Sequence, residues 1–140
     1  MTKKRHVLIV RCSDGLTTRP PELIGTILHQ IRVPGGILFP NLCEQQNGED
    51  PDVVGRLLSA MLFSIETMVR LKSPDEIVLM SHDPCGAALA MNLTETDVST
   101  AHLEWAARIR EHFPHIPVTI IHERHCRDGH WREPHIAVAA

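Results

Sequence analysis

The chain has 140 residues, of which 43% are hydrophobic and 22% are charged. This length and composition predict a single folded domain over residues 1–140 and exclude a chain that is disordered throughout. The formal net charge is −3 and no basic stripe runs along the sequence, so nucleic acid is not an expected partner.

The sequence carries no recognisable targeting or membrane segment. A basic cluster at residues 3–5 is followed by an apolar run of residues 7–10 that Arg11 ends, which is too short for a signal peptide. No stretch approaches the roughly 20 apolar residues of a membrane span. We therefore expect a soluble, cytoplasmic protein without a membrane partner. In that reducing compartment the four cysteines, none of them in a CxxC pair, are expected as metal ligands, nucleophiles or packing residues.

The first element in chain order is a short apolar strand at residues 6–11, which runs into the loop sequence CSDG. A short helix over residues 21–30 is predicted next, because two prolines stand at its start and Pro is favoured in a first turn. Residues 31–33 are expected to form a second short strand, which a Pro-Gly-Gly sequence ends.

The middle of the chain carries the clearest helix pattern. Residues 40–50 are polar and predict a loop, whereas residues 52–71 repeat apolar side chains at helical spacing. Residues 76–80 form another apolar run, which is typical of a buried strand, and the sequence SHDPCG follows it.

The last third predicts two helices and a strand. The helices are expected at residues 86–91 and 99–113, and the strand at residues 118–122, whereas the tail gives no clear pattern. Strands that alternate with helices predict an α/β fold with a parallel sheet covered on both faces, in three α/β/α layers.

Metal-ligand residue types follow two of the predicted strands. Cys12 and Asp14 come after the first strand, and His82 and Cys85 come after the third. Ligands of α/β sheets sit beyond the carboxyl ends of the strands, so the two loops meet if these strands are neighbours. Two sulfurs and an imidazole suit zinc, and Asp14 or water would complete the tetrahedron. The alternative is that the cysteines are buried packing residues and His82 a hydrogen-bonded loop residue.

Three motifs also resemble those of a known family. The sequence CSDG at residues 12–15 resembles a CxDxR signature, and SHDPCGAA at residues 81–88 resembles a GHxxCG motif. Between them, IRVPGG at residues 31–36 is similar to an RNAGG segment. The motifs stand in the same order as in the β-class carbonic anhydrases, and the resemblance spans residues 6 to about 91.

This resemblance implies a site, a fold and an activity. Cys12, His82 and Cys85 would be the zinc ligands, and Asp14 would either coordinate the zinc or release it to water. The fold would be a four- or five-stranded parallel sheet with central order 2-1-3-4, assembled as a homodimer or a higher homo-oligomer. The activity would be that of a lyase that reversibly hydrates carbon dioxide to bicarbonate by zinc-bound hydroxide.

The chain departs from the family pattern at Leu16, where the family has an arginine. Bidentate hydrogen bonds from such an arginine hold the aspartate off the metal. Without it, Asp14 can stay on the zinc and close the site, and closed sites are typically structural. Arg32 of the IRVPGG segment or Arg19 can take over this role, so we predict Asp14 and Arg32 as the catalytic residues of an open site.

Three other functions remain open from the sequence. The first is a non-catalytic homologue with a closed structural zinc site. The second is a related zinc hydrolase that acts on carbonyl sulfide or carbon disulfide. The third is a cysteine-nucleophile phosphatase or arsenate reductase, because Arg19 lies beyond Cys12 in one loop. That signature needs five intervening residues, and this loop has six.

Several further side chains have no assigned role. His6 and His29 are candidates for relaying a proton, although nothing in the sequence singles either out. The tail segment at residues 122–130 gathers three histidines and Cys126, and we expect a polar loop there in preference to a second metal site. Cys43 is expected to be an ordinary free thiol.

Overall fold

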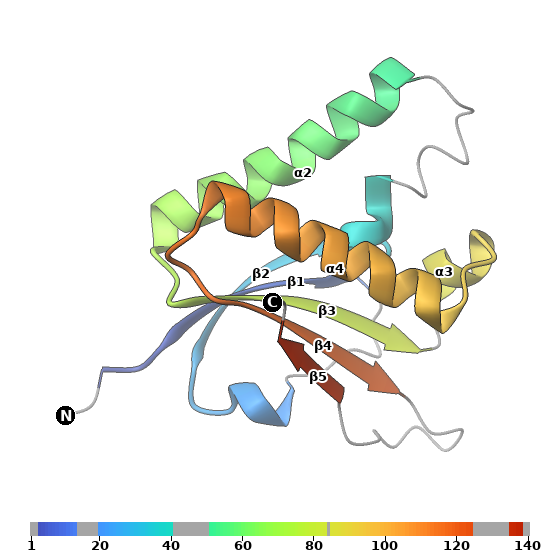
Figure 1. Cartoon of the computed structure of the whole chain (residues 1–140). Helices are drawn as coiled ribbons and strands as arrows, with labels where there is room; N and C mark the ends of the chain where they lie inside the picture. The colour runs from blue at the N-terminus through green and yellow to red at the C-terminus, as the bar shows by residue number, and fades with distance from the viewer. Residues whose placement is uncertain (1–2, 14–19, 41–50, 84, 125–134, 139–140) are drawn as a thin grey trace.

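The computed structural model describes residues 3–13, 20–40, 51–83, 85–124 and 135–138. Five strands form one sheet in the order β2-β1-β3-β4-β5 (Figure 1). Their bounds are β1 His6–Cys12, β2 Ile27–Val33, β3 Glu76–Asp83, β4 Val118–Arg124 and β5 His135–Val138. The first four strands are parallel and β5 is antiparallel to β4. The predicted order 2-1-3-4 is therefore confirmed, and the tail adds an edge strand that the sequence pattern did not predict.

The centre of the sheet is the most deeply buried part of the described chain. In β1, Val10 lies opposite Ile31 of β2 and Leu79 of β3. The side chains of residues 7–10 and 77–79 have no exposed surface. Parallel strands that are covered on both faces need apolar residues at successive positions, which is why these two runs do not alternate with polar residues.

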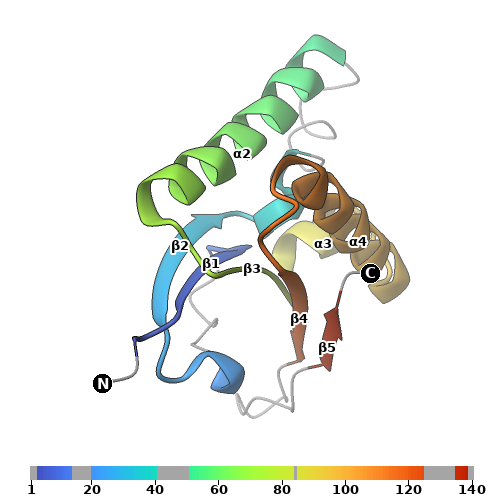
Figure 2. The same ribbon diagram turned by 60° about the vertical axis from the view of Figure 1, so that its left-hand side comes forward.

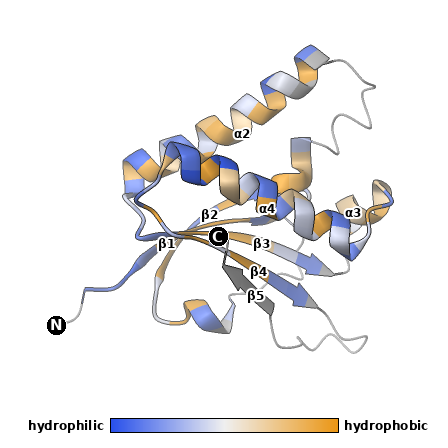
Figure 3. Cartoon of the chain, viewed as in Figure 1, coloured by the Kyte–Doolittle hydropathy of each residue, from blue (hydrophilic) through white to orange (hydrophobic). Residues whose placement is uncertain are grey.

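Two long helices cover one face of the sheet. These are α2, Pro51–Lys72, and α4, Glu95–His112, and both lie above the strands in Figures 1 and 2. Their apolar side chains, among them Ile65 and Trp105, pack on Leu8 and Val10 of β1. The hydropathy colours of Figure 3 show apolar residues concentrated along the strands beneath them. None of the helices in the described part of the chain combines the length and apolar composition of a membrane span.

The opposite face and the carboxyl end of the sheet carry shorter elements. The 3₁₀ helix η1, Pro21–Leu23, places Leu23 against Ile9, Val78 and other side chains of the second face. Beyond the carboxyl ends of the strands lie a second 3₁₀ turn, η2 Gly36–Leu38, and the short helix α3, Gly86–Ala90 (Figure 1).

The structure corrects one predicted helix and extends several elements. Residues 21–30 do not form one helix, because the 3₁₀ turn η1 ends at Leu23 and β2 already begins at Ile27. Gly25, with φ +84°, supports the turn between them. Helix α4 begins four residues earlier than predicted, because Thr94 and Asp97 form a capping box. Helix α2 matches its prediction to within one residue at each end.

Gly35 connects β2 to η2 at a place where no side chain fits. Its φ is +76°, and a Cβ there would lie 2.7 Å from the Cβ of Ala87 in α3. Its backbone N–H also donates a hydrogen bond to the Cys12 sulfur at 3.2 Å. The absence of a side chain therefore lets β2, β1 and α3 approach one another.

We expect Gly35→Ala to lower the free energy of unfolding by about 1–3 kcal/mol, because it adds both left-handed backbone strain and steric overlap. The matched control is Gly55→Ala in α2, where an added Cβ meets nothing within 4 Å. That control should raise the free energy of unfolding by up to about 1 kcal/mol. Urea denaturation measures both, and equal effects of the two substitutions would contradict the account of Gly35.

Candidate metal centre

Three of the predicted metal ligands meet at the carboxyl end of the sheet. Cys12 is the last residue of β1, His82 lies near the end of β3, and Cys85 directly precedes α3. Their ligand atoms all lie within 4.8 Å of one another, and all three residues are buried. Among the described residues this is the one group of three or more such side chains that can hold a metal ion.

The donor set and its spacing fit zinc. Zn–S bonds near 2.3 Å and Zn–N bonds near 2.0 Å place tetrahedral ligand atoms about 3.5–3.8 Å apart. Small side-chain shifts would therefore close the three atoms around one ion. Neither ring nitrogen of His82 has a hydrogen-bond partner in the described part of the chain, although both are buried. A metal ion would satisfy one of them, since a buried polar atom without a partner is costly.

The protonation of the two thiols also favours a bound metal ion. A hydrogen bond with Cys12, together with burial, raises the pKa of the Cys85 thiol, while backbone N–H groups of Ala88 and Ala87 lower it. Two neighbouring sulfurs that share hydrogen bonds resist deprotonation, because each thiolate repels the other. A divalent cation removes this penalty, so the pair is suited to binding one.

A small cavity opens beside His82 and Cys85. Its volume is about 80 Å³. It is lined by His82, Cys85, Ala88, Leu89, Leu93, Thr94, Glu95, Val98 and His122. Pockets for drug-sized ligands span roughly 300–1,000 Å³, whereas one water needs about 10–15 Å³ in such a cavity. The space therefore suits a molecule of a few atoms.

His122 of β4 connects this cavity to the surface. Its Nδ1 is hydrogen-bonded to Ser81 Oγ at 2.6 Å, and its Nε2 lies 3.7 Å from Glu95 Oε1. The Glu95 side chain is 57% exposed, against 16% for His122. Sequence reasoning placed His122 only at the start of the tail segment, because its pairing with Ser81 depends on the β3–β4 register.

Two buried ionisable side chains, Arg11 and Glu123, lie on the opposite face of the sheet from His122. Burial, together with the charge of the nearby Arg32, lowers the pKa of Arg11 to about 10, and the charge of Glu123 opposes this. Burial raises the pKa of Glu123 to about 7, and the charges of Arg11 and His82 oppose the rise. Arg11 and Glu123 thus stabilise each other's charged form next to the candidate ligand His82. Neither residue was predicted from the sequence.

The remaining predicted residues lie elsewhere or outside the described part of the chain. Asp14 falls outside the described residues, as do Leu16 and Arg19, so the fourth ligand stays a prediction. Arg32 is exposed on β2, where its Nε donates to Gln30 Oε1 at 2.9 Å.

The two relay candidates are far from the centre. His6 begins β1 and Cys12 ends it, six residues or about 20 Å further along the strand. His29 lies beside His6, with ring nitrogens 2.9 Å apart. Residues 125–130 of the tail and Cys43 fall outside the described residues.

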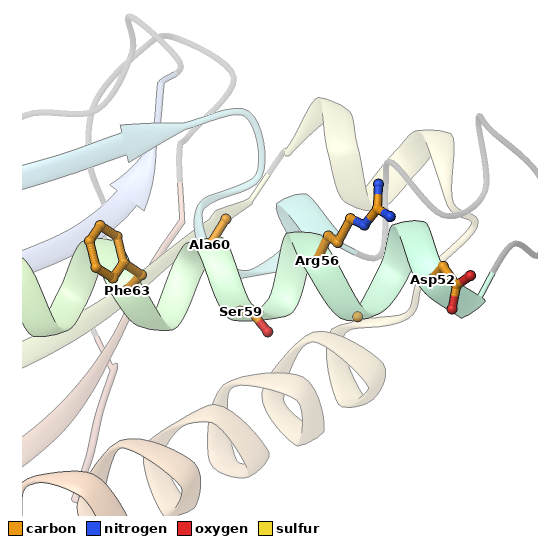
Figure 4. A pocket seen from close by; sticks show the side chains of 6 residues that line it. Asp52, Arg56, Ser59, Ala60 and Phe63 are labelled. Atoms are coloured by element: carbon orange, nitrogen blue, oxygen red, sulfur yellow. The ribbon is translucent and has the colours of Figure 1, made fainter.

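A larger hollow lies away from these residues. It has a volume of about 740 Å³ and runs along one side of α2 (Figure 4). It is lined by Asp52, Gly55, Arg56, Ser59, Ala60 and Phe63. These side chains come from a single helix and include no histidine or cysteine. The small cavity beside His82 and Cys85 is therefore the better candidate for an active site, although it is smaller.

His102 of α4 is a buried histidine with His122 nearby. Its Nδ1 donates to the Val98 carbonyl at 2.8 Å, and its Nε2 has no partner within the described chain. Burial lowers its pKa from 6.5 to about 4. The folded protein therefore keeps His102 neutral at a pH where the unfolded chain protonates it.

We expect this histidine to make stability pH-dependent. Its contribution is complete above pH 6.5 and is lost as the pH falls towards 4, by roughly 3 kcal/mol in all. His102→Leu should therefore lose less stability than the wild type over this window, as measured by denaturant unfolding with a chelator present. Glu123 acts in the opposite sense, because its raised pKa favours the folded state at lower pH, but both proteins contain it. Parallel pH profiles would contradict the prediction.

Comparison with known proteins gives structural likenesses alone. No family model and no curated protein matches the sequence. Among solved structures, the chain is similar to tetrameric β-carbonic anhydrase from the filamentous ascomycete Sordaria macrospora, with 16% identity and a TM-score of 0.48 over 94% of this chain and 81% of that one. It is also similar to the β-carbonic anhydrase CcaA, with 16% identity and a TM-score of 0.47 over 93% of this chain and 73% of that one. Function is therefore inferred from the residues of the site.

Proposed function

We propose that the protein binds one zinc ion through Cys12, His82 and Cys85 and reversibly hydrates carbon dioxide. The observation that carries this proposal is the convergence of the three buried ligand atoms within 4.8 Å at the carboxyl end of a parallel sheet. The motifs around these residues, which resemble those of the β-class carbonic anhydrases, supply the reaction. The cavity of about 80 Å³ suits carbon dioxide and bicarbonate in size.

The residues around the centre have defined tasks in this proposal. Zinc in a site with an open position makes water a nucleophile near neutral pH, which is the chemistry that carbon dioxide hydration needs. Ala88 and Val98 give the cavity an apolar wall that favours a small uncharged gas over water. His122 holds a hydrogen bond to Ser81 at Nδ1 and faces Glu95 with Nε2, so it can pass a proton from the cavity towards the surface.

A closed structural zinc site is the second candidate. Leu16 stands where the resembled family has an arginine, and this favours an Asp14 carboxylate that stays on the metal. The same three ligands would then hold zinc without an open position, and the protein would be a non-catalytic homologue. Carbonyl sulfide and carbon disulfide are further candidate substrates, because they need the same activated water and a cavity of the same size.

We also propose a cytoplasmic homo-oligomer, at the least a dimer. Several large apolar side chains are exposed on the described chain, among them Phe63 and Leu71 of α2 and Ile24, Leu89 and Leu103 elsewhere. Apolar side chains that are exposed singly are ordinary on a protein surface, so the proposal of an oligomer rests on the resemblance of the motifs.

Purified protein should carry about one zinc ion per chain, as measured by elemental analysis. Removing zinc with a chelator should lower Tm on the order of 10 °C, because zinc at 1,000 times its Kd stabilises the native state by about 4 kcal/mol. Cys85→Ala should lose stoichiometric zinc, whereas Cys43→Ser, which changes a cysteine that is not among the proposed ligands, should keep it. Wild-type protein that takes up no zinc would refute the metal site.

Zinc-loaded protein should hydrate carbon dioxide above the buffer background in a stopped-flow pH-indicator assay. Cys85→Ala should lower this activity more than about 100-fold. Loss of a residue that only hydrogen-bonds to a metal ligand already costs 10- to 100-fold, and Cys85 is itself a proposed ligand. Background activity in a fully zinc-loaded wild type would instead favour the closed site, and assays with carbonyl sulfide and carbon disulfide would follow. Metal-free protein that cleaves p-nitrophenyl phosphate would favour the cysteine-nucleophile alternative.

A further inference from the structure

A buried carboxylate lies directly beside the candidate ligand His82. Glu123 of β4 is the register partner of His82 on the neighbouring strand β3, and partners on adjacent strands lie about 4.8 Å apart. Side chains alternate along a strand, so Glu123 shares a face with Ile121 and His82 shares a face with Met80. Ile121 and Met80 belong to the same buried cluster, which places Glu123 and His82 on the same face of the sheet.

Both side chains are almost completely buried, and both lack partners. His82 is 3% exposed and Glu123 is 2% exposed. Neither oxygen of Glu123 and neither nitrogen of His82 has a hydrogen-bond partner within the described residues. A buried carboxylate accepts hydrogen bonds and a metal-bound imidazole has one N–H to donate, so each supplies what the other needs.

A buried positive charge lies on the same face as Glu123. Arg11 is 1% exposed. Burial raises the pKa of Glu123, and the charge of Arg11 opposes this rise. By the alternation of β1, Arg11 lies on the same face as Val7 and Ile9, which belong to the cluster that contains Ile121. Arg11 on β1, His82 on β3 and Glu123 on β4 therefore lie on one buried face of three adjacent strands.

We propose that Glu123 is a positioning residue for the metal centre, which accepts a hydrogen bond from the His82 ring N–H that does not face the cysteines. This inference rests on the proposed zinc site. One ring nitrogen of His82 faces the two sulfurs, and the carboxylate fixes the orientation and tautomer of the ring through the other nitrogen. Such outer partners make the ligand nitrogen more basic, and their loss typically weakens metal binding 10- to 100-fold.

The first test is the zinc affinity of the full chain with Glu123→Gln, measured by competition with a chromophoric chelator. The substitution keeps the shape and an acceptor oxygen but removes the charge, and it should weaken zinc binding 10- to 100-fold. The matched control is Glu22→Gln, which removes a charge from the same neighbourhood at an exposed position. Glu22→Gln should change the zinc affinity by less than about twofold, because the charge that it removes is exposed and screened by solvent.

The second test is the ring N–H resonance of His82, recorded by NMR on the wild type with and without zinc. A hydrogen bond to a carboxylate protects this proton from exchange and moves its resonance downfield, and Glu123→Gln should move it upfield while Glu22→Gln leaves it in place. This readout does not depend on catalysis, and the wild type alone suffices if the variant fails to fold.

The outcomes separate this inference from the proposed function. A wild type that binds zinc, with an unprotected His82 ring proton or with unchanged affinity in Glu123→Gln, would overturn the role of Glu123 and leave the zinc site standing. A wild type that binds no zinc would overturn the proposed function, and the His82 resonance of the metal-free protein would still decide whether the contact exists.

Discussion

The parallel pairing of β1 with β3 is the constraint on which the candidate centre depends. Val10 lies opposite Leu79, and this register carries both strands to the same edge of the sheet. Cys12 ends one strand and His82 lies near the end of the other, so ligands about 70 positions apart in the sequence become neighbours. The pairing is stable because apolar side chains cover it on both faces, from α2 and α4 on one side and from Leu23 on the other.

The sheet thus divides into an apolar end and a polar end. Towards the amino ends of the central strands the buried residues are aliphatic, whereas near the carboxyl ends the buried polar residues Arg11, Ser81, His82 and Glu123 gather around the cysteines. Burying this many polar groups is costly unless they bind one another or an ion. Their arrangement on three adjacent strands is difficult to explain by packing alone and is consistent with a site.

The metal ligands could be predicted from the sequence because each lies beside an apolar run. The strand order followed from the resemblance of the motifs, and the structure has that order. The helix over residues 21–30 was wrong because a proline-rich start fits a 3₁₀ turn as well as an α-helix, and because Ile27 and Leu28 pair with β1. Local pattern could not show that pairing.

The residues that lie beside the predicted metal ligands could not be predicted from the sequence, for a different reason. Glu123 and His122 stand at the end of β4, where their neighbours are fixed by the register with β3. A sequence window shows them only as polar residues after an apolar strand. Arg11 was read as the end of an apolar run, although its guanidinium is buried beneath the sheet.

The two cysteines also determine the net charge of the metal centre. Two thiolates carry two negative charges, which a divalent cation cancels, and the imidazole adds none. A neutral molecule in the fourth position therefore leaves a site without net charge, which a protein interior accommodates at little cost. The carboxylate of Asp14 in that position would leave one negative charge to be compensated. The leucine at position 16 and the charge balance therefore act in opposite directions: the missing arginine favours Asp14 as the fourth ligand, whereas the charge count favours water.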